Sequence, residues 1–214
     1  MGSFRGFCSR LIFCQTGSYT GRPTAATAMQ DLMTLVTLIT LLIGCTPVNT
    51  PIADDLASLE NPPPAVQEKI EQLLPVVLEW YTRTEQQLLP LGRSLSPAEQ
   101  ELASTLGVKA PEQVRVVVLE TFPLPDDEVL LQEAIRYGFG STREVGRTQG
   151  YVIMLKPGHQ QSAAILSHEL VHVAQHDRMG REAFLRRYLT ELITLGYERS
   201  PLELEAYSRQ LRND

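Results

Sequence analysis

Two histidines and a glutamate lie within five residues of one another in the last quarter of the chain. His168-Glu-Leu-Val-His172 is an H-E-x-x-H sequence. On an α-helix, residues four apart lie on the same face, so both imidazoles can reach one metal ion. Zinc accepts neutral imidazole nitrogens and prefers a tetrahedral shell. Glu169 is rotated by about 100° from His168, so it flanks the metal, where the general base for a zinc-activated water must stand.

The residues around the motif predict a buried helix that carries it. Ser162 is suited to the N-cap and Gly180 to the position after the last turn. Apolar residues recur between them at helical spacing. The alternative is a polar patch on an ordinary amphipathic helix. That alternative is disfavoured because two histidines and a glutamate would be costly to bury without a metal.

The motif leaves zinc one protein ligand short, because a catalytic zinc takes three protein ligands and a water. His176 follows one turn after His172, but on a straight helix it rises about 12 Å from His168. That is too far to share an ion at bonds of about 2 Å. In the longer metzincin motif, a third histidine would stand where this chain has Arg178. The third ligand is therefore expected from another helix.

Two glutamates near the C-terminus are the candidates for this ligand. Glu203 and Glu205 lie in one short helical stretch, about 200° apart around the axis, so only one can face the metal. Glu203 shares its face with Ala206, whose small side chain lets this helix approach the motif helix closely. The alternative role for Glu203 is a capping-box bond back to Ser200. Glu203 is the preferred ligand and Glu205 the alternative.

The remaining patterns predict an α+β, mostly helical fold with a small sheet packed on the motif helix. Apolar spacing indicates a helix from residue 65 that Pro75 should kink. Ser96-Pro-Ala-Glu99 is a capping box for a helix that stops near Gly107. The other expected elements are a strand at 113–120, a helix at 126–137, a loop or hairpin at 141–150, a strand at 151–155, a helix at 181–195 and a last helix from 200.

Composition bounds the class of protein. The 214 residues carry a formal net charge of −6, and an acidic domain is a poor candidate for binding nucleic acid. The cysteines are Cys8, Cys14 and Cys45, so no internal disulfide can form after residue 45. The length suits one domain, which must rely on its core and on a metal for stability.

The N-terminal part of the chain predicts export and a lipid anchor. Residues 1–28 are polar and unpatterned, with Met29 as an alternative start. The apolar run at 32–43 is too short to span a bilayer, which needs about 20 residues, but suits a signal peptide. It ends in Leu42-Ile-Gly-Cys45, which resembles the lipobox of bacterial lipoproteins, where the cysteine is lipidated. The alternative is a buried apolar helix with an incidental cysteine.

These features divide the chain into three parts. Residues 1–44 form an extension and signal segment, residues 45–64 a polar, proline-rich tether, and residues 65–214 a single domain. Lipidation at Cys45 predicts an extracytoplasmic protein that is anchored to the membrane of a bacterial cell envelope.

The domain resembles the small gluzincin-like zinc peptidase domains of bacteria. The likeness covers about residues 110–212, with a core at 168–175, 184–188, 196–197 and 201–206. It implies a minimal zincin-like domain in which Glu203, three residues before an alanine, is the third ligand. It also implies that the strand at 151–155 is the sheet edge that pairs with an extended substrate. The family's usual aspartate after the alanine is here Tyr207, so what orients the histidines stays open.

The sequence therefore predicts a zinc metallopeptidase whose partners are a peptide or protein substrate and, through its lipid, a membrane. Glu169 would be the catalytic base, and Tyr197, Tyr207 or His159 could stabilise the oxyanion. Two alternatives remain. One is a zinc amidase that acts on cell-wall amides. The other is a non-catalytic, zinc-stabilised binding lipoprotein.

Overall fold

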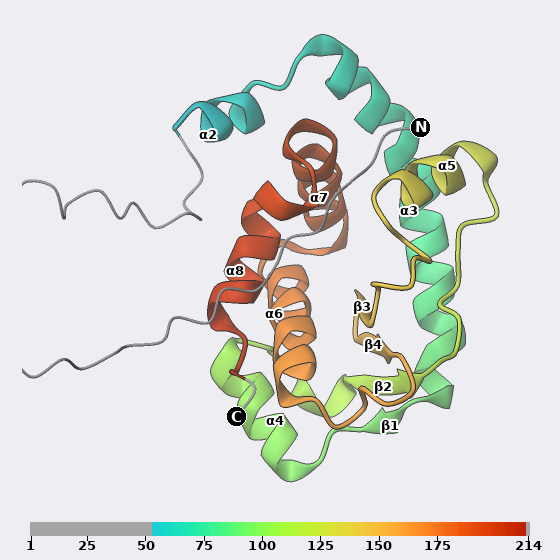
Figure 1. Ribbon diagram of the computed structural model, residues 1–214, viewed down its shortest axis with the longest axis vertical. Coiled ribbons are helices and arrows are strands. Elements are labelled where there is room, and N and C mark those ends of the chain that lie inside the picture. Colours follow the sequence, from blue (N-terminus) through green and yellow to red (C-terminus); the bar gives the residue numbers. More distant parts are fainter. Residues whose placement is uncertain (1–52, 213–214) are drawn as a thin grey trace, which may run out of the picture. The chain divides into compact units, whose positions relative to one another are not determined.

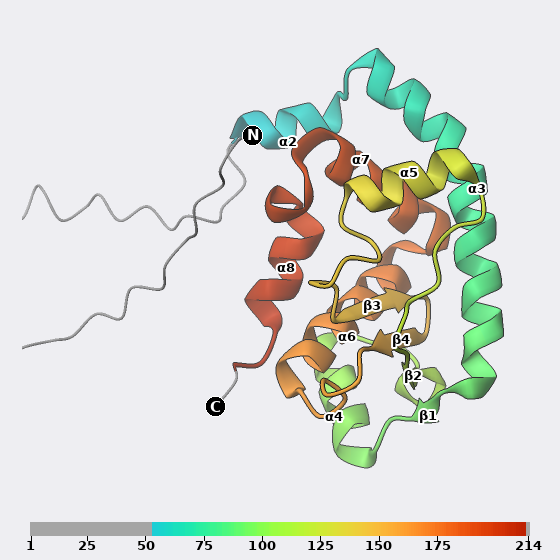
Figure 2. The same cartoon turned by 45° about the vertical axis from the view of Figure 1, so that its right-hand side comes forward.

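The computed structural model describes residues 53–212. The predictions for the signal segment and for Cys45 lie outside these residues. Within the described range, no helix is both long enough and apolar enough to cross a membrane. The elements of this range are drawn from two directions in Figures 1 and 2.

The fold is α+β and mostly helical, which confirms the prediction. The helices are α2 (Ala53–Glu60), α3 (Pro64–Leu88), α4 (Pro97–Leu106), α5 (Glu128–Arg136), α6 (Ala163–Met179), α7 (Arg181–Leu195) and α8 (Pro201–Arg209). Short 3-10 turns are η1 (Leu89–Leu91), η2 (Pro111–Gln113) and η3 (Tyr197–Arg199). The strands are β1 (Arg93–Ser94), β2 (Arg115–Val118), β3 (Gly146–Gln149) and β4 (Val152–Leu155).

The helix boundaries follow the expected local signals. The Ser96–Glu99 capping box opens α4, and Gly107, with a φ of 96°, closes it. Pro75 lies inside α3, and both views show this helix changing direction along its length. Gly196 caps the end of α7, as its position predicts.

The four strands form one mixed sheet in the order β1-β2-β4-β3. β2 and β4 run parallel, and β3 pairs antiparallel with β4. The strand expected at the substrate edge, residues 151–155, is therefore an interior strand. The edge is instead β3, within the segment 141–150 that reads as a loop or hairpin. Its Gly-Arg-Thr-Gln sequence lacks the apolar alternation that marks a strand.

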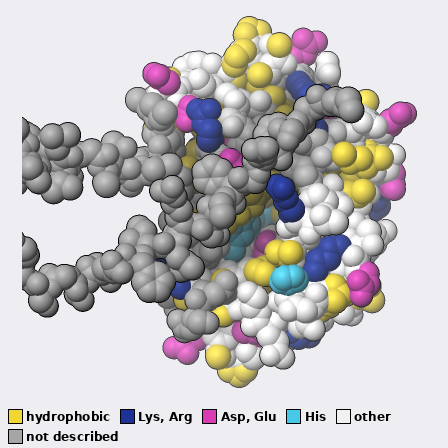
Figure 3. All heavy atoms as spheres, viewed as in Figure 1, with side chains coloured by type: hydrophobic (Ala, Val, Ile, Leu, Met, Phe, Trp, Pro, Cys, Tyr) yellow, Lys and Arg dark blue, Asp and Glu magenta, His cyan; other side chains and the backbone are white. Residues whose placement is uncertain are grey.

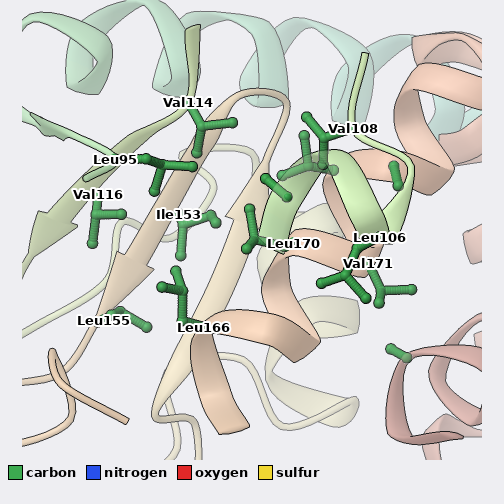
Figure 4. Close-up of a cluster of buried hydrophobic side chains, with 14 residues drawn as sticks. Leu95, Leu106, Val108, Val114, Val116, Ile153, Leu155, Leu166, Leu170 and Val171 are labelled. Atoms are coloured by element: carbon green, nitrogen blue, oxygen red, sulfur yellow. The ribbon is translucent and has the colours of Figure 1, made fainter. Parts of the chain in front are cut away.

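The motif helix α6 packs on this sheet. One hydrophobic cluster joins β2 and β4 to α4 and α6 through side chains such as Val116, Ile153 and Leu170, as Figure 4 shows. A second cluster joins α3 to α7 through Leu73, Trp80 and other residues. Because α6 is buried against the sheet and against α4 and α8, its motif is held by contacts along most of its length.

The segment 45–64 differs from a plain tether. Its residues 53–60 form α2, which contacts α7. Asp54 and Asp55 occupy its first turn, where acidic side chains favour a helix N-terminus. Asp55 is buried and pairs with Arg199 of η3. This ion pair, far apart in the sequence, holds part of the expected tether against the domain.

Candidate metal centre

The motif helix α6 begins and ends as its sequence predicts. The Ser162 hydroxyl oxygen accepts a hydrogen bond from the Ile165 N–H, and Gly180 is the C-cap. His168 and His172 are each only 7% exposed and Glu169 is 6% exposed. The motif therefore lies on a buried helix, so its polar groups need partners inside the domain.

Glu203 of α8 completes a three-residue group with the two histidines. The two Nε2 atoms of His168 and His172 lie 3.2 Å apart. Glu203 Oε2 lies 3.4 Å from His168 Nε2, and Glu203 Oε1 lies 3.5 Å from His172 Nε2. Figure 3 shows histidine side chains next to a carboxylate, set back in a hollow of the drawn face.

These separations fit a shared metal ion. Ligand atoms of a tetrahedral shell with bonds of 2.0–2.1 Å lie about 3.3–3.4 Å apart. In addition, Glu203 Oε2 is buried and has no hydrogen-bond partner within the described domain. A buried carboxylate oxygen without a donor is costly unless a cation neutralises it. The group His168, His172 and Glu203 could thus bind a metal ion.

The position of Glu203 depends on α7. Glu191 of α7 is buried, and its Oε2 accepts hydrogen bonds from the Ser200 hydroxyl at 2.6 Å and the Leu202 N–H at 2.9 Å. This carboxylate anchors the start of α8. From the same helix, the Tyr188 hydroxyl donates to Glu203 Oε1 at 2.7 Å. A glutamate on the inner face of α7 gave no signal in the sequence, because periodicity assigns such a residue to solvent.

The capping-box alternative for Glu203 is met only in part. The Ser200 hydroxyl accepts a hydrogen bond from the Glu203 N–H at 3.4 Å, as an N-cap does. The Glu203 carboxylate turns instead toward Tyr188 and the two histidines. The Glu203 backbone N–H therefore binds the N-cap residue Ser200, while the Glu203 carboxylate faces the histidines, where it could bind a metal.

The other metal candidates lie elsewhere. Glu205 pairs with Arg178 at 2.9 Å, so the structure does not bring it to the histidines. His176 stacks against Tyr81 with ring centroids 6.1 Å apart. Its exclusion from the metal group agrees with the rise of the helix, which separates it from His168.

Glu169 lies beside the metal group and is held by the edge strand. The Thr148 hydroxyl donates to Glu169 Oε2 at 2.7 Å. A Cβ at Gly146 would lie 2.5 Å from Glu169 Oε1, so only glycine leaves room for this carboxylate. Burial raises the pKa of Glu169, and this effect outweighs the opposing charges of the two histidines. A buried carboxyl group with a raised pKa is suited to taking up and releasing a proton.

Charge inside the group is balanced between Glu203 and His172. Burial alone would lower the pKa of His172, but the neighbouring Glu203 charge raises it to about 9. Burial alone would raise the pKa of Glu203, but the charge of His172, the nearby His168 and the hydrogen bond from Tyr188 lower it. Glu203 is therefore ionised at neutral pH, and a cation would compete with the proton on His172.

Two glutamines contact the far nitrogens of the histidines. His172 Nδ1 lies 2.9 Å from Gln175 Oε1, and His168 Nδ1 lies 3.2 Å from Gln210 Oε1. The Tyr207 ring stands edge-on to the His168 ring, with centroids 4.5 Å apart. Tyr207 thus contributes an aromatic contact to His168, and amide oxygens contact the Nδ1 atoms of both histidines.

Two of the three oxyanion candidates lie near the metal group. The hydroxyls of Tyr197 and Tyr207 are 3.3 Å apart, and these side chains are 38% and 48% exposed. Burial and the Glu203 charge raise the pKa of Tyr197, so its hydroxyl keeps its proton at neutral pH. His159 lies in the turn between β4 and α6, where its N–H bonds to the Lys156 carbonyl.

Comparison with protein-family models, with curated proteins and with solved structures finds no match for this chain.

Proposed function

We propose that this chain is a zinc-dependent hydrolase that cleaves peptide bonds. The observation that carries the proposal is the spacing of 3.2–3.5 Å among His168, His172 and Glu203, with Glu169 beside them. Two imidazole nitrogens favour zinc over magnesium or calcium, which prefer oxygen ligands.

Zinc in this position would lower the pKa of a water molecule to about 7 and polarise a substrate carbonyl. The chain's own residues supply the proton transfer. Glu169 accepts the proton of the attacking water and passes it to the leaving amine, and its raised pKa suits both steps. Thr148 holds the carboxylate in place through its hydroxyl. Tyr197 and Tyr207, whose hydroxyls lie 3.3 Å apart, would donate to the developing oxyanion.

The edge strand β3 supports a peptide as the substrate. The Lys156 N–H bonds to the Val145 carbonyl. The next pairs along the two strands are Gly146 with Leu155, Arg147 with Met154 and Thr148 with Ile153. In such a ladder, Gly146 and Thr148 occupy the positions whose backbone groups point away from β4. An extended peptide can bond to these groups as an added strand. The same two residues contact Glu169, so the peptide would pass the catalytic carboxylate.

Metal content of the purified full-length chain tests the proposal. We expect one zinc per chain by elemental mass spectrometry and none in His168→Ala. His159→Ala is the matched control, because this histidine lies outside the metal group. It should keep its zinc. Absence of zinc in the wild type after incubation with the metal would overturn the proposal and favour the non-catalytic alternative.

We also propose that Cys45 carries a lipid that anchors the domain to a membrane. The support is the apolar run that ends at this cysteine and the polar segment that follows it. The protein should sediment with membranes on cell fractionation, and Cys45→Ser should release it. A soluble wild-type protein would contradict the anchor without affecting the zinc site.

A further inference from the structure

We infer that Gln175 is a positioning residue that sets the tautomer of His172, and that α8 controls it through Glu205 and the Leu202 carbonyl. The inference rests on the proposed zinc site and concerns the residues behind it. Gln175 lies three residues after His172 on α6, fully buried. Its side chain stands between the histidine and α8.

The orientation of the Gln175 amide follows from its partners on α8. Its nitrogen lies 2.9 Å from the Leu202 carbonyl oxygen and 3.1 Å from Glu205 Oε2. Both partners only accept hydrogen bonds, because Leu202 offers a carbonyl oxygen and the Glu205 carboxylate already takes two hydrogen bonds from Arg178. Only the NH₂ end of the amide can satisfy two acceptors. The oxygen must then face His172.

The amide oxygen in turn determines which ring nitrogen carries hydrogen. Gln175 Oε1 accepts, so His172 Nδ1, at 2.9 Å, must donate. Nε2 is then the nitrogen that is free of hydrogen when the ring is neutral. It points at His168 Nε2 and Glu203 Oε1, as a metal ligand must. The same bond fixes the orientation of the His172 ring, because Gln175 is fully buried and its amide nitrogen is bonded to α8.

Glu205 and Arg178 extend this series of hydrogen bonds from the buried Gln175 to the surface of the domain. Arg178 donates two hydrogen bonds to the Glu205 carboxylate, at 3.1 and 2.9 Å. Glu205 therefore has a defined role although it does not join the metal group. A single short helix, α8, supplies both the ligand Glu203 and the acceptors that orient the His172 partner. The partner is a neutral amide, so it adds no negative charge to the histidine.

Replacing the amide tests the inference. Gln175→Met keeps the length of the side chain and removes its acceptor and donor. We expect the full-length variant to bind zinc about 10–100-fold more weakly in competition with a chelator. In the metal-free chain, at a pH where the His172 ring is neutral, its ¹⁵N shifts should change from those of one tautomer to those of a mixture. Gln100→Met is the control, because Gln100 lies on α4 and its side-chain amide bonds to the Leu95 carbonyl, not to a residue of the metal group. It should leave both readouts unchanged.

A second variant of different shape separates positioning from general loss of packing. Gln175→Leu also removes the acceptor and the donor, but it fills the site with a branched side chain. Because both variants lose the same acceptor, Gln175→Leu should also weaken zinc binding about 10–100-fold and give the same mixture of His172 tautomers. A single His172 tautomer in either variant would overturn the inference.

The outcomes for the inference and for the proposed function are distinct. If Gln175→Met binds zinc as tightly as the wild type and keeps one tautomer, the inference is wrong and the zinc hydrolase proposal stands. If the wild type binds no zinc, the proposed function fails and this inference fails with it.

Discussion

Three polar residues of the candidate site are each held by a hydrogen-bond partner. Thr148 of β3 binds Glu169, Tyr188 of α7 binds Glu203, and Gln175 binds His172. Such contacts restrict the side chains to one rotamer each, which lowers the entropy cost of assembling a site. The charged groups also offset one another, because Glu203 is ionised beside a histidine whose pKa is raised.

The role of Glu169 leads to a prediction at this scale. Glu169→Gln keeps the shape of the side chain and the bond to Thr148 but cannot take up a proton. We expect hydrolysis of a peptide substrate to fall by on the order of 10²–10⁴-fold, while zinc content stays at the wild-type value. Turnover and metal content measured on the same preparation check both parts. Hydrolysis at the wild-type rate would show that Glu169 is not the base.

The helix α3 positions the edge strand at the scale of elements. Its Tyr81 hydroxyl oxygen accepts a hydrogen bond from the Gly150 N–H at 2.6 Å, and Glu85 Oε1 accepts from the Tyr151 N–H at 2.8 Å. These two bonds fix the turn that joins β3 to β4. Because α3 packs on α7 and bonds to this turn, it is a structural part of the domain.

The turn at Gly150 gives a prediction for this contact. Gly150 has a φ of 62°, and an added Cβ would lie 1.9 Å from Glu85 Oε1. Gly150→Ala should therefore combine backbone strain with displacement of Glu85, and we expect a loss of more than about 2 kcal/mol in the free energy of unfolding. Denaturant unfolding followed by circular dichroism measures it.

Gly158→Ala is the matched control for this change. Gly158 has a φ of 85°, but a Cβ there meets nothing within 4 Å. Gly158→Ala should lower the free energy of unfolding through backbone strain alone, by about 1 kcal/mol. Equal losses in the two variants would mean that the contact with Glu85 contributes nothing to stability.

At the scale of the described domain, burial disfavours protonation of His176. His176 packs among Tyr81, Tyr151 and Phe184, and neither of its ring nitrogens has a hydrogen-bond partner among residues 53–212. Burial lowers its pKa, and the charge of Arg181 lowers it further, against the opposing charges of Glu85 and Asp177.

This histidine should make the stability of the domain depend on pH. In the unfolded chain His176 binds a proton near pH 6.5, whereas in the folded domain it stays neutral to lower pH. Its contribution to the free energy of unfolding is therefore complete above pH 6.5 and is lost as pH falls below that value. His172 acts in the opposite sense, since its raised pKa favours the folded state below pH 6.5 and that contribution is lost as pH rises through about 9.

The comparison of two proteins isolates the His176 effect. Both proteins are measured with a chelator present. As pH falls from 7.5 to 5.5, we expect the free energy of unfolding of His176→Leu to rise relative to that of the wild type, because leucine takes up no proton. Urea unfolding at both pH values measures the difference. A difference that does not change with pH would contradict the burial of a neutral His176.

The local features of this protein were determined by its sequence. The bounds of α4, α6 and α7, their caps, and the placement of both histidines on one face of α6 follow from residues within a few positions of one another. The preference for Glu203 over Glu205 rested on the same kind of reasoning, because Glu203 shares a face with a small residue.

Contacts between distant elements were decided only by the tertiary structure. The docking of α8 against α6 and α7 determines that Glu203 meets the histidines and that Glu205 instead binds Gln175. The identity of β3 as the sheet edge, the burial of Glu191 and the helix at residues 53–60 had no local signal. The physical reason is that burial and hydrogen-bond partners belong to pairs of segments, whereas periodicity and capping belong to one segment at a time.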